Sequence, residues 1–175
     1  MQLVNSTTKL LQKAYTELAR DNSPKITVNA VTKQAGTSRG TFYLYYDSIE
    51  SLKADLSETL LEKLFSYTPG QHTQAGEIAK DYLHFLSEFT IKHRDELYSF
   101  IVYETYEPFI EKYKEFLKKC TSMCHYDKKT LNEESINYVI AAAIGIIRVW
   151  LMDNDGTDTA QLDQLAWNLA IHTKF

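Results

Sequence analysis

Residues 35–46 read AGTSRGTFYLYY, so two glycines and three small hydroxyl residues are followed by a run of aromatic residues. Gly36 interrupts the helical pattern that precedes it, and Ser38 is a favourable N-cap for a following short helix. Thr27 can cap an earlier short helix that ends at Gln34. Two short helices joined by a tight, glycine-containing turn form a helix-turn-helix. The sequence therefore predicts this motif at about residues 27–46.

In a helix-turn-helix, the first turn of the second helix, expected at 39–45, enters the major groove of DNA. Gly40 and Thr41 are small enough to let the backbone approach the groove, and Arg39 can reach a guanine edge or a phosphate. Solvation is the alternative for Arg39, and core packing is the alternative for the tyrosines. Phe42 is expected in the core. The predicted DNA-binding residues are Thr27, Ser38, Arg39, Gly40, Thr41, Tyr43 and Tyr45.

The net charge of −4 hides an asymmetry along the chain. Residues 1–46 carry six basic and two acidic residues, which gives +4, whereas the rest carries 13 basic and 21 acidic residues, which gives −8. A basic N-terminal part on an acidic body indicates that only the N-terminal part meets a polyanion. Lys25 and Lys33 are either solvated charges or phosphate contacts.

Helical spacing of apolar residues continues along the rest of the chain, and no segment reads as a strand. Asp47 and Glu50 resemble a capping box that opens a long helix, and a linker with a Pro-Gly turn follows at 68–73. The expected helices are 6–21, 27–34, 39–45, the long helix before the linker, 75–92, 96–104, 108–125, 132–152 and 158–173. These patterns predict an all-α protein.

Several other classes of protein fit the sequence poorly. Two cysteines do not make a disulfide framework in a chain of 175 residues, which favours a reducing, cytoplasmic compartment. No apolar run reaches the roughly 18 residues of a membrane span. Cys120, Cys124 and His125 fall short of a four-ligand structural metal site. With no catalytic constellation and no phosphate-binding loop, we expect neither an enzyme nor a cofactor.

The segment ITVNAVTKQAGTSRGTFYLYYDSIESL, residues 26–52, resembles the DNA-binding region of the TetR family of transcriptional regulators. KLLQKAYTELA, residues 9–19, resembles the first helix of that family. There are three departures. Thr32 stands where the family commonly has alanine, Tyr46 where it has phenylalanine, and Ile49 where it has a lysine that contacts phosphate. The positions that match the family pattern are Thr27, Val28, Val31, Ala35, Gly36, Thr37, Ser38, Arg39, Gly40, Thr41, Phe42, Tyr43, Tyr45 and Tyr46.

The resemblance implies a homodimeric repressor that binds a palindromic operator in double-stranded DNA and is released by a small-molecule effector. It implies a helix-turn-helix DNA-binding domain at 1–48 and a helical effector-binding and dimerisation domain at 49–175. Aromatic residues that could line an effector pocket are Tyr82, Phe85, Phe89, Tyr103, Tyr106 and Phe109.

Dimerisation is expected through the last two helices, which form a four-helix bundle with their copies in this family. YVIAAAIGIIRVW, residues 138–150, is apolar nearly all round, and a helix of that kind needs more than one neighbour. The expected dimerisation residues are Ala141, Ala142, Gly145, Trp150, Leu162, Leu165 and Leu169.

Two alternatives remain at this stage. The first is a regulator of the same fold that acts mainly through a partner protein, with weakened DNA binding. Ile49 and the modest +4 charge of the N-terminal part favour it. The second is a small helical enzyme or ligand carrier, which would leave the helix-turn-helix unexplained.

Overall fold

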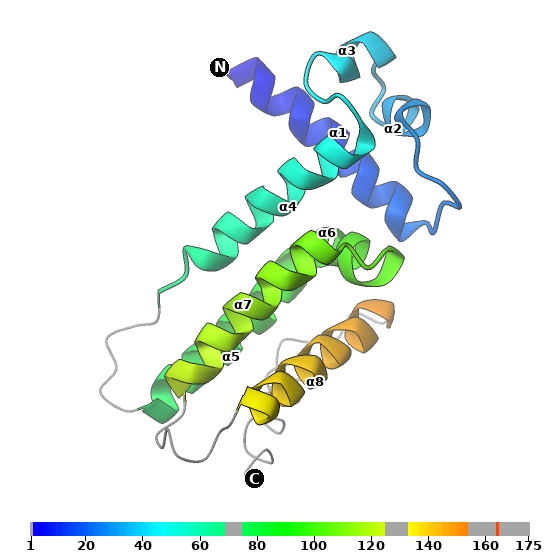
Figure 1. The fold of residues 1–175 in the computed structure, drawn as a ribbon. Coiled ribbons are helices and arrows are strands. Elements are labelled where there is room, and N and C mark those ends of the chain that lie inside the picture. Colours follow the sequence, from blue (N-terminus) through cyan, green and yellow to red (C-terminus); the bar gives the residue numbers. More distant parts are fainter. Residues whose placement is uncertain (1, 69–74, 125–132, 154–163, 165–175) are drawn as a thin grey trace.

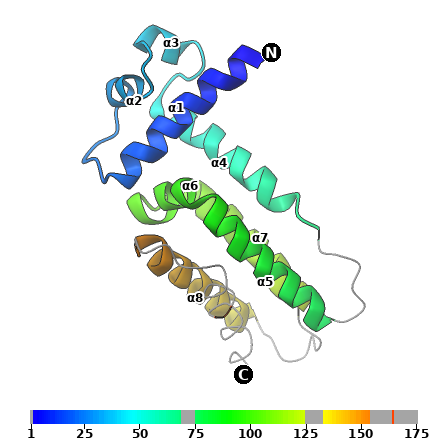
Figure 2. The ribbon, with the colours of Figure 1, turned by 180° about the vertical axis from the view of Figure 1, so that it is seen from behind.

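The computed structural model describes residues 2–68, 75–124, 133–153 and 164. Every regular element in these ranges is a helix, which confirms the predicted all-α class. Figure 1 shows three helices, α1–α3, gathered at one end of the molecule and the long helices α5, α7 and α8 lying side by side at the other. Helix α4 runs between the two groups, and the view from behind agrees (Figure 2).

The N-terminal group, which we call the head, consists of α1 (Gln2–Arg20), α2 (Val28–Gln34) and α3 (Arg39–Tyr43). Helix α1 starts earlier than the predicted residue 6. The other two helices are too short to be stable alone, so they depend on caps and on burial of their inner faces. Val31 of α2 and Phe42 of α3 are fully buried together with Leu11 of α1.

Helix α4 (Ile49–Phe65) leads out of the head. Its N-cap is Ser48, whose side chain accepts from the backbone N–H of Ser51, while the Ser51 hydroxyl accepts from the backbone N–H of Ser48. The predicted capping box of Asp47 with Glu50 was therefore wrong by one residue, because a neighbouring pair offers the same chemistry at the right spacing. Along one side α4 buries Leu52, Leu56, Leu60 and Leu64.

The body contains α5 (Ala75–Lys92), α6 (Arg94–Tyr98), a π-helical segment η1 (Ser99–Tyr103), α7 (Glu107–Cys124) and α8 (Glu133–Met152). The single helix predicted at 96–104 is thus a short α-helix that widens into a π-helical turn. That turn buries Ser99, Phe100 and Ile101. It packs against α1 of the head as well as against α7 and α8, so its irregular backbone lies where the head meets the body.

Stacked and edge-on rings fill the body between α4, α5 and α7. Tyr67 stacks on Phe85 with ring centroids 3.8 Å apart, and Phe116 meets the rings of Phe65, Tyr82 and Phe85 at 5.4–6.4 Å. A second stack joins Phe100, Phe109 and Tyr113. These contacts explain the high aromatic content of the chain, since rings offset or edge-on to each other pack favourably.

Two predicted features lie outside the described residues. They are the final helix at 158–173, with Leu162, Leu165 and Leu169, and the side-chain environment of Cys120, Cys124 and His125. Among the residues that are described, no helix is both long and apolar enough to cross a membrane.

Candidate nucleic-acid interface

Two hydroxyl caps fix where the short helices of the head begin, as the sequence predicted. The Thr27 side chain accepts a hydrogen bond from the backbone N–H of Ala30 at 3.2 Å and caps α2. The Ser38 side chain accepts from the backbone N–H of Thr41 at 3.0 Å and caps α3. The Ser38 and Thr41 hydroxyls also lie 2.9 Å apart and share a hydrogen bond. Both cap residues are exposed.

The turn between α2 and α3 depends on Gly36. Its φ is 64°, in the left-handed region that residues with a side chain rarely adopt. The backbone N–H groups of Gly36 and Thr37 bond back to the carbonyls of Lys33 and Thr32. The chain can therefore leave α2 and turn directly into the cap of α3.

Helix α3 presents one face to the core of the head and the other to solvent. Phe42 and Tyr46 are buried, and Phe42 packs edge-on against Tyr43 at 5.6 Å. Arg39 and Gly40 are exposed, and Tyr43 is 48% exposed. Tyr45 is half-buried and packs against the edge of the core. The structure thus gathers the predicted DNA-binding residues of α3 on one outer surface, with Tyr45 at its margin.

A hydrogen-bonded cluster anchors the end of α3 to α1 and α4. The Tyr46 hydroxyl donates to Asp55 Oδ2 at 2.6 Å, and Gln12 Nε2 donates to the same oxygen at 2.9 Å. Burial, and then the adjacent Asp55 carboxylate, raise the pKa of Tyr46 well above its ordinary value. The tyrosine is therefore a firm hydrogen-bond donor at neutral pH, and it gives the phenylalanine-to-tyrosine departure a structural role.

The start of α4 offers no lysine for a phosphate. Ile49 is half-buried and packs against the core. Lys53, one turn later, is only 12% exposed and pairs with Glu104. By contrast, Lys25, which precedes α2, and Lys33, in α2, are both exposed.

Glu104 joins the head to the body, a contact that the sequence did not predict. It follows η1 and accepts a hydrogen bond from the Tyr15 hydroxyl of α1 at 2.8 Å. Its carboxylate oxygens lie 3.2 and 3.3 Å from Lys53 Nζ of α4. Burial, followed by the hydrogen bond and charge of Glu104, raises the pKa of Tyr15 well above its ordinary value.

Further polar contacts surround this junction. Arg20 at the end of α1 pairs with Asp95 of α6 at 3.3 Å, and Tyr103 donates to the Ser23 carbonyl at 2.7 Å. Tyr98 donates to Asn22 Oδ1 at 3.2 Å. The α6–η1 segment therefore touches the head through several side chains, and a shift of that segment would move the end of α1.

The residues expected to line an effector pocket take part mainly in core packing. Tyr82, Phe89 and Phe109 are buried, and Phe85 is half-buried in the ring stack described above. Tyr103 lies at the head–body junction rather than among these rings. Tyr106 lines an open, largely apolar groove of about 390 Å³ between α4 and α7, together with Leu61, Phe65 and Pro108.

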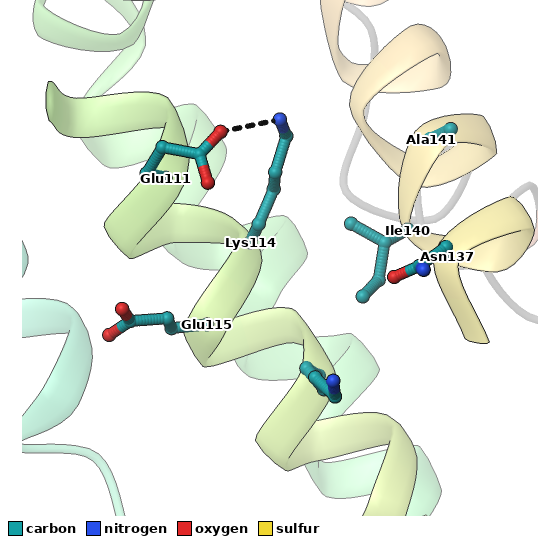
Figure 3. A pocket seen from close by; sticks show the side chains of 7 residues that line it. Glu111, Lys114, Glu115, Asn137, Ile140 and Ala141 are labelled. Atoms are coloured by element: carbon teal, nitrogen blue, oxygen red, sulfur yellow. Dashed lines mark hydrogen bonds and ion pairs between the residues drawn. The ribbon is translucent and has the colours of Figure 1, made fainter. Parts of the chain in front are cut away.

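Another hollow of about 370 Å³ lies between α7 and α8 (Figure 3). Its α7 side carries charged groups, of which Lys114 and Glu111 form a 2.8 Å ion pair. Its α8 side carries Asn137, Ile140 and Ala141. The charged rim and the open shape distinguish it from the aromatic pocket that the sequence suggested.

Helix α8 has an inner and an outer face. Ile140, Ile147 and Leu151 are buried, as is Trp150, which is 5% exposed and lies under the Arg94 guanidinium at 4.6 Å. Trp150, expected at the dimer surface, is thus packed inside the protomer. The outer face carries Tyr138, Ala141, Gly145, Val149 and Met152, all exposed, and Ala142 lies at its edge, half-buried. The spacing of these residues forms one stripe along the helix.

Comparison with known proteins supports the fold as a whole. No protein-family model matches the chain. Over 63 residues the chain is 33% identical to YvdT of Bacillus subtilis, described as an uncharacterized HTH-type transcriptional regulator. That match covers 36% of this chain and 32% of YvdT, so it spans about a third of the length of the relative.

Two solved structures share the fold over nearly the whole chain. The fatty acid degradation regulator FadR from Bacillus halodurans has a TM-score of 0.74 at 16% identity, and covers 93% of this chain and 94% of its own. A TetR transcriptional regulator from Streptococcus agalactiae has a TM-score of 0.71 at 19% identity, covering 99% and 97%. The chain therefore has the fold of these regulators, with an N-terminal helix-turn-helix and a C-terminal helical domain.

Proposed function

We propose that the protein is a DNA-binding transcriptional regulator of the TetR type, acting in the cytoplasm and without enzymatic activity. The observation that carries the proposal is the outer surface of α3. Ser38 caps the helix, Phe42 and Tyr46 hold its inner face, and Arg39 and Gly40 remain exposed at its first turn. A short helix held this way can enter a major groove with its N-terminal residues against the bases.

The DNA-binding domain of this proposal is residues 1–48. Arg39 contacts a guanine edge or a phosphate, and Thr27, Thr41, Tyr43 and Tyr45 supply hydroxyls to phosphate oxygens. The basic charge of this end supports the assignment, because neutralisation of phosphates by Lys and Arg provides the part of DNA affinity that does not depend on sequence. A stretch of 63 residues that is 33% identical to an HTH-type transcriptional regulator also supports the proposal.

Residues 49–175 form the effector and dimerisation domain of the proposal. The exposed outer stripe of α8 supports dimerisation, because Ala141 and Gly145 allow another helix to approach closely and Val149 and Met152 would be covered by it. Two copies would place two recognition helices on palindromic half-sites about one DNA turn, roughly 34 Å, apart.

In this proposal the protein is a repressor that an apolar or planar effector releases from its operator. The effector would bind by opening the packed rings of Tyr82, Phe85, Phe89 and Phe109, and it would shift the balance between two arrangements of the heads. The α6–η1 segment supports such coupling, since it contacts the body core on one side and α1 of the head on the other.

The proposal is tested by selecting bound duplexes from a random DNA pool and measuring their affinity for purified protein. Arg39→Ala should lower affinity for the selected operator by about 1–3 kcal/mol per half-site if the side chain reads a guanine. Lys33→Ala is the matched control, because it removes an exposed cation of the head outside α3. Unchanged affinity for Arg39→Ala in a folded protein would exclude α3 as the reading helix.

A second candidate function is regulation through a partner protein, with weak DNA binding. The half-buried Ile49 and the engaged Lys53 favour it, because neither supplies the phosphate contact that the family commonly has at the start of α4. The same selection distinguishes the two functions. Failure to enrich any duplex, at low as well as moderate salt, would favour the partner-protein function.

A further inference from the structure

Leu44 is the most exposed large apolar side chain of the described residues. It is 79% exposed, and it directly follows α3. The DNA contacts of the proposed function are made by charged, hydroxyl or glycine residues, so Leu44 has no part in them. Single exposed leucines are common on protein surfaces, so it is the place of Leu44 beside the outer surface of α3 that suggests a role in binding.

The backbone shows which way Leu44 points. Its φ of −75° and ψ of −19° are helical, and the N–H of Tyr46 bonds to the carbonyl of Phe42 at 3.0 Å, so the helical path continues past the end of α3. At about 100° per residue, Phe42 and Tyr46 mark the buried side, and Leu44 falls opposite their midpoint. Gly40 lies one turn earlier on nearly the same side as Leu44.

The surroundings of Leu44 indicate the kind of partner. Gly40 leaves the helix surface bare on this side, and an added Cβ there would meet only the Ser38 hydroxyl, at 3.6 Å. Exposed Arg39 and Tyr43 flank the same surface with one cation and one phenol. This combination fits the edge and backbone of a duplex better than an apolar protein groove, because the cation and hydroxyls would have to be desolvated in such a groove.

We propose that Leu44 is a specificity-determining residue that packs on the C5-methyl group of a thymine in the major groove. The proposal rests on the DNA-binding function proposed above and names a residue and a base for it. Leucine offers no hydrogen bond, and the thymine methyl is the apolar group that a base pair presents in the major groove. Gly40 brings the helix close, and Leu44 fills the next turn.

The test uses the full-length protein and its selected operator, with each thymine replaced in turn by deoxyuridine, which removes only the methyl group. We expect one thymine per half-site whose replacement weakens wild-type binding about fourfold, the factor for one methyl group taken out of water. Leu44→Ala should bind thymine and deoxyuridine operators equally at that position. Tyr43→Phe should weaken binding to both operators alike and keep the fourfold difference.

Equal deoxyuridine effects in wild type and Leu44→Ala would overturn the proposal, and so would a wild type that is insensitive to every replacement. If Leu44→Ala binds too weakly to compare, Leu44→Val gives the same comparison with a smaller side-chain loss. Unchanged operator affinity in Leu44→Ala would instead assign the side chain to a protein contact. Enrichment of no duplex would overturn the DNA-binding function itself, whereas the other outcomes leave it intact.

Discussion

At the scale of single residues, the two glycines of the helix-turn-helix have different tasks. Gly36 has a φ of 64°, and an added Cβ there would meet nothing within 4 Å. Its requirement is therefore backbone conformation rather than space. Gly40 has an ordinary helical backbone, and its added Cβ would make only an ordinary contact at 3.6 Å. The fold therefore does not require glycine at this position, and in the proposed function Gly40 keeps the helix surface bare for the DNA.

These differences predict that substitutions at the two glycines act on different properties, stability at Gly36 and DNA binding at Gly40. Gly36→Ala should lower the free energy of unfolding by about 1 kcal/mol, because alanine is strained in the left-handed region. Gly40→Val should change it by less than about 1 kcal/mol. It should nevertheless weaken operator binding by about tenfold or more per half-site, because the branched side chain holds the helix off the groove.

Urea unfolding and operator binding, measured on both variants, check this pair. Each variant serves as the control for the other, since one change acts on folding and the other on binding. A Gly40→Val protein that is as stable as wild type and binds the operator equally well would contradict a groove-facing α3.

At the scale of elements, the local sequence pattern predicted the helix caps and the turn well. Contacts between residues far apart in the sequence were not predicted. Thr27, Gly36 and Ser38 are caps and turn residues whose partners lie within a few positions, so sequence alone located α2 and α3. Sequence placed the cap of α4 at Asp47 rather than Ser48, because adjacent polar residues offer the same signal. Only the three-dimensional structure separates them.

The contacts of the body depend on which elements pack together, which one sequence does not encode locally. Glu104 and Tyr15 are 89 positions apart, and nothing near either residue signals the other. The apolar run of α8 likewise could not show that Trp150 faces the protomer core while Val149 faces solvent. When a helix is apolar on every side, its sequence does not indicate which side faces the core. The neighbouring helices therefore determine which face is buried.

The link between η1, α1 and α4 gives a prediction at this scale. Glu104→Ala should lower the free energy of unfolding by about 1–3 kcal/mol, because the buried Tyr15 hydroxyl loses its acceptor and Lys53 its carboxylate. In the Tyr15→Phe background the same change should cost less, since no tyrosine hydroxyl is then left unsatisfied. Urea unfolding of the four proteins of this cycle measures the difference. Strictly additive effects would show that the hydrogen bond does not connect head and body energetically.

At the scale of the whole molecule, the outer stripe of α8 matters most. Tyr138, Gly145, Val149 and Met152 lie on the side of α8 opposite its buried residues Ile147 and Leu151. Two heads can engage two half-sites only if a dimer holds them at a fixed spacing. In the proposed function, the oligomeric state therefore links the body of the molecule to DNA affinity.

Gly145→Arg tests this link. An added Cβ at Gly145 would meet nothing within 4 Å, so the protomer itself should tolerate the change. A second arginine on this side of α8, beside the exposed Arg148, should prevent close helix approach, and we expect monomers by light scattering. Ala54→Arg is the matched control, because it places the same side chain at an exposed small residue of α4, and it should remain dimeric.

The monomer should bind single half-sites and palindromic operators with similar affinity, because the second head is no longer tethered to the first. A soluble Gly145→Arg dimer that still prefers the palindrome would show that the stripe on α8 is not the interface.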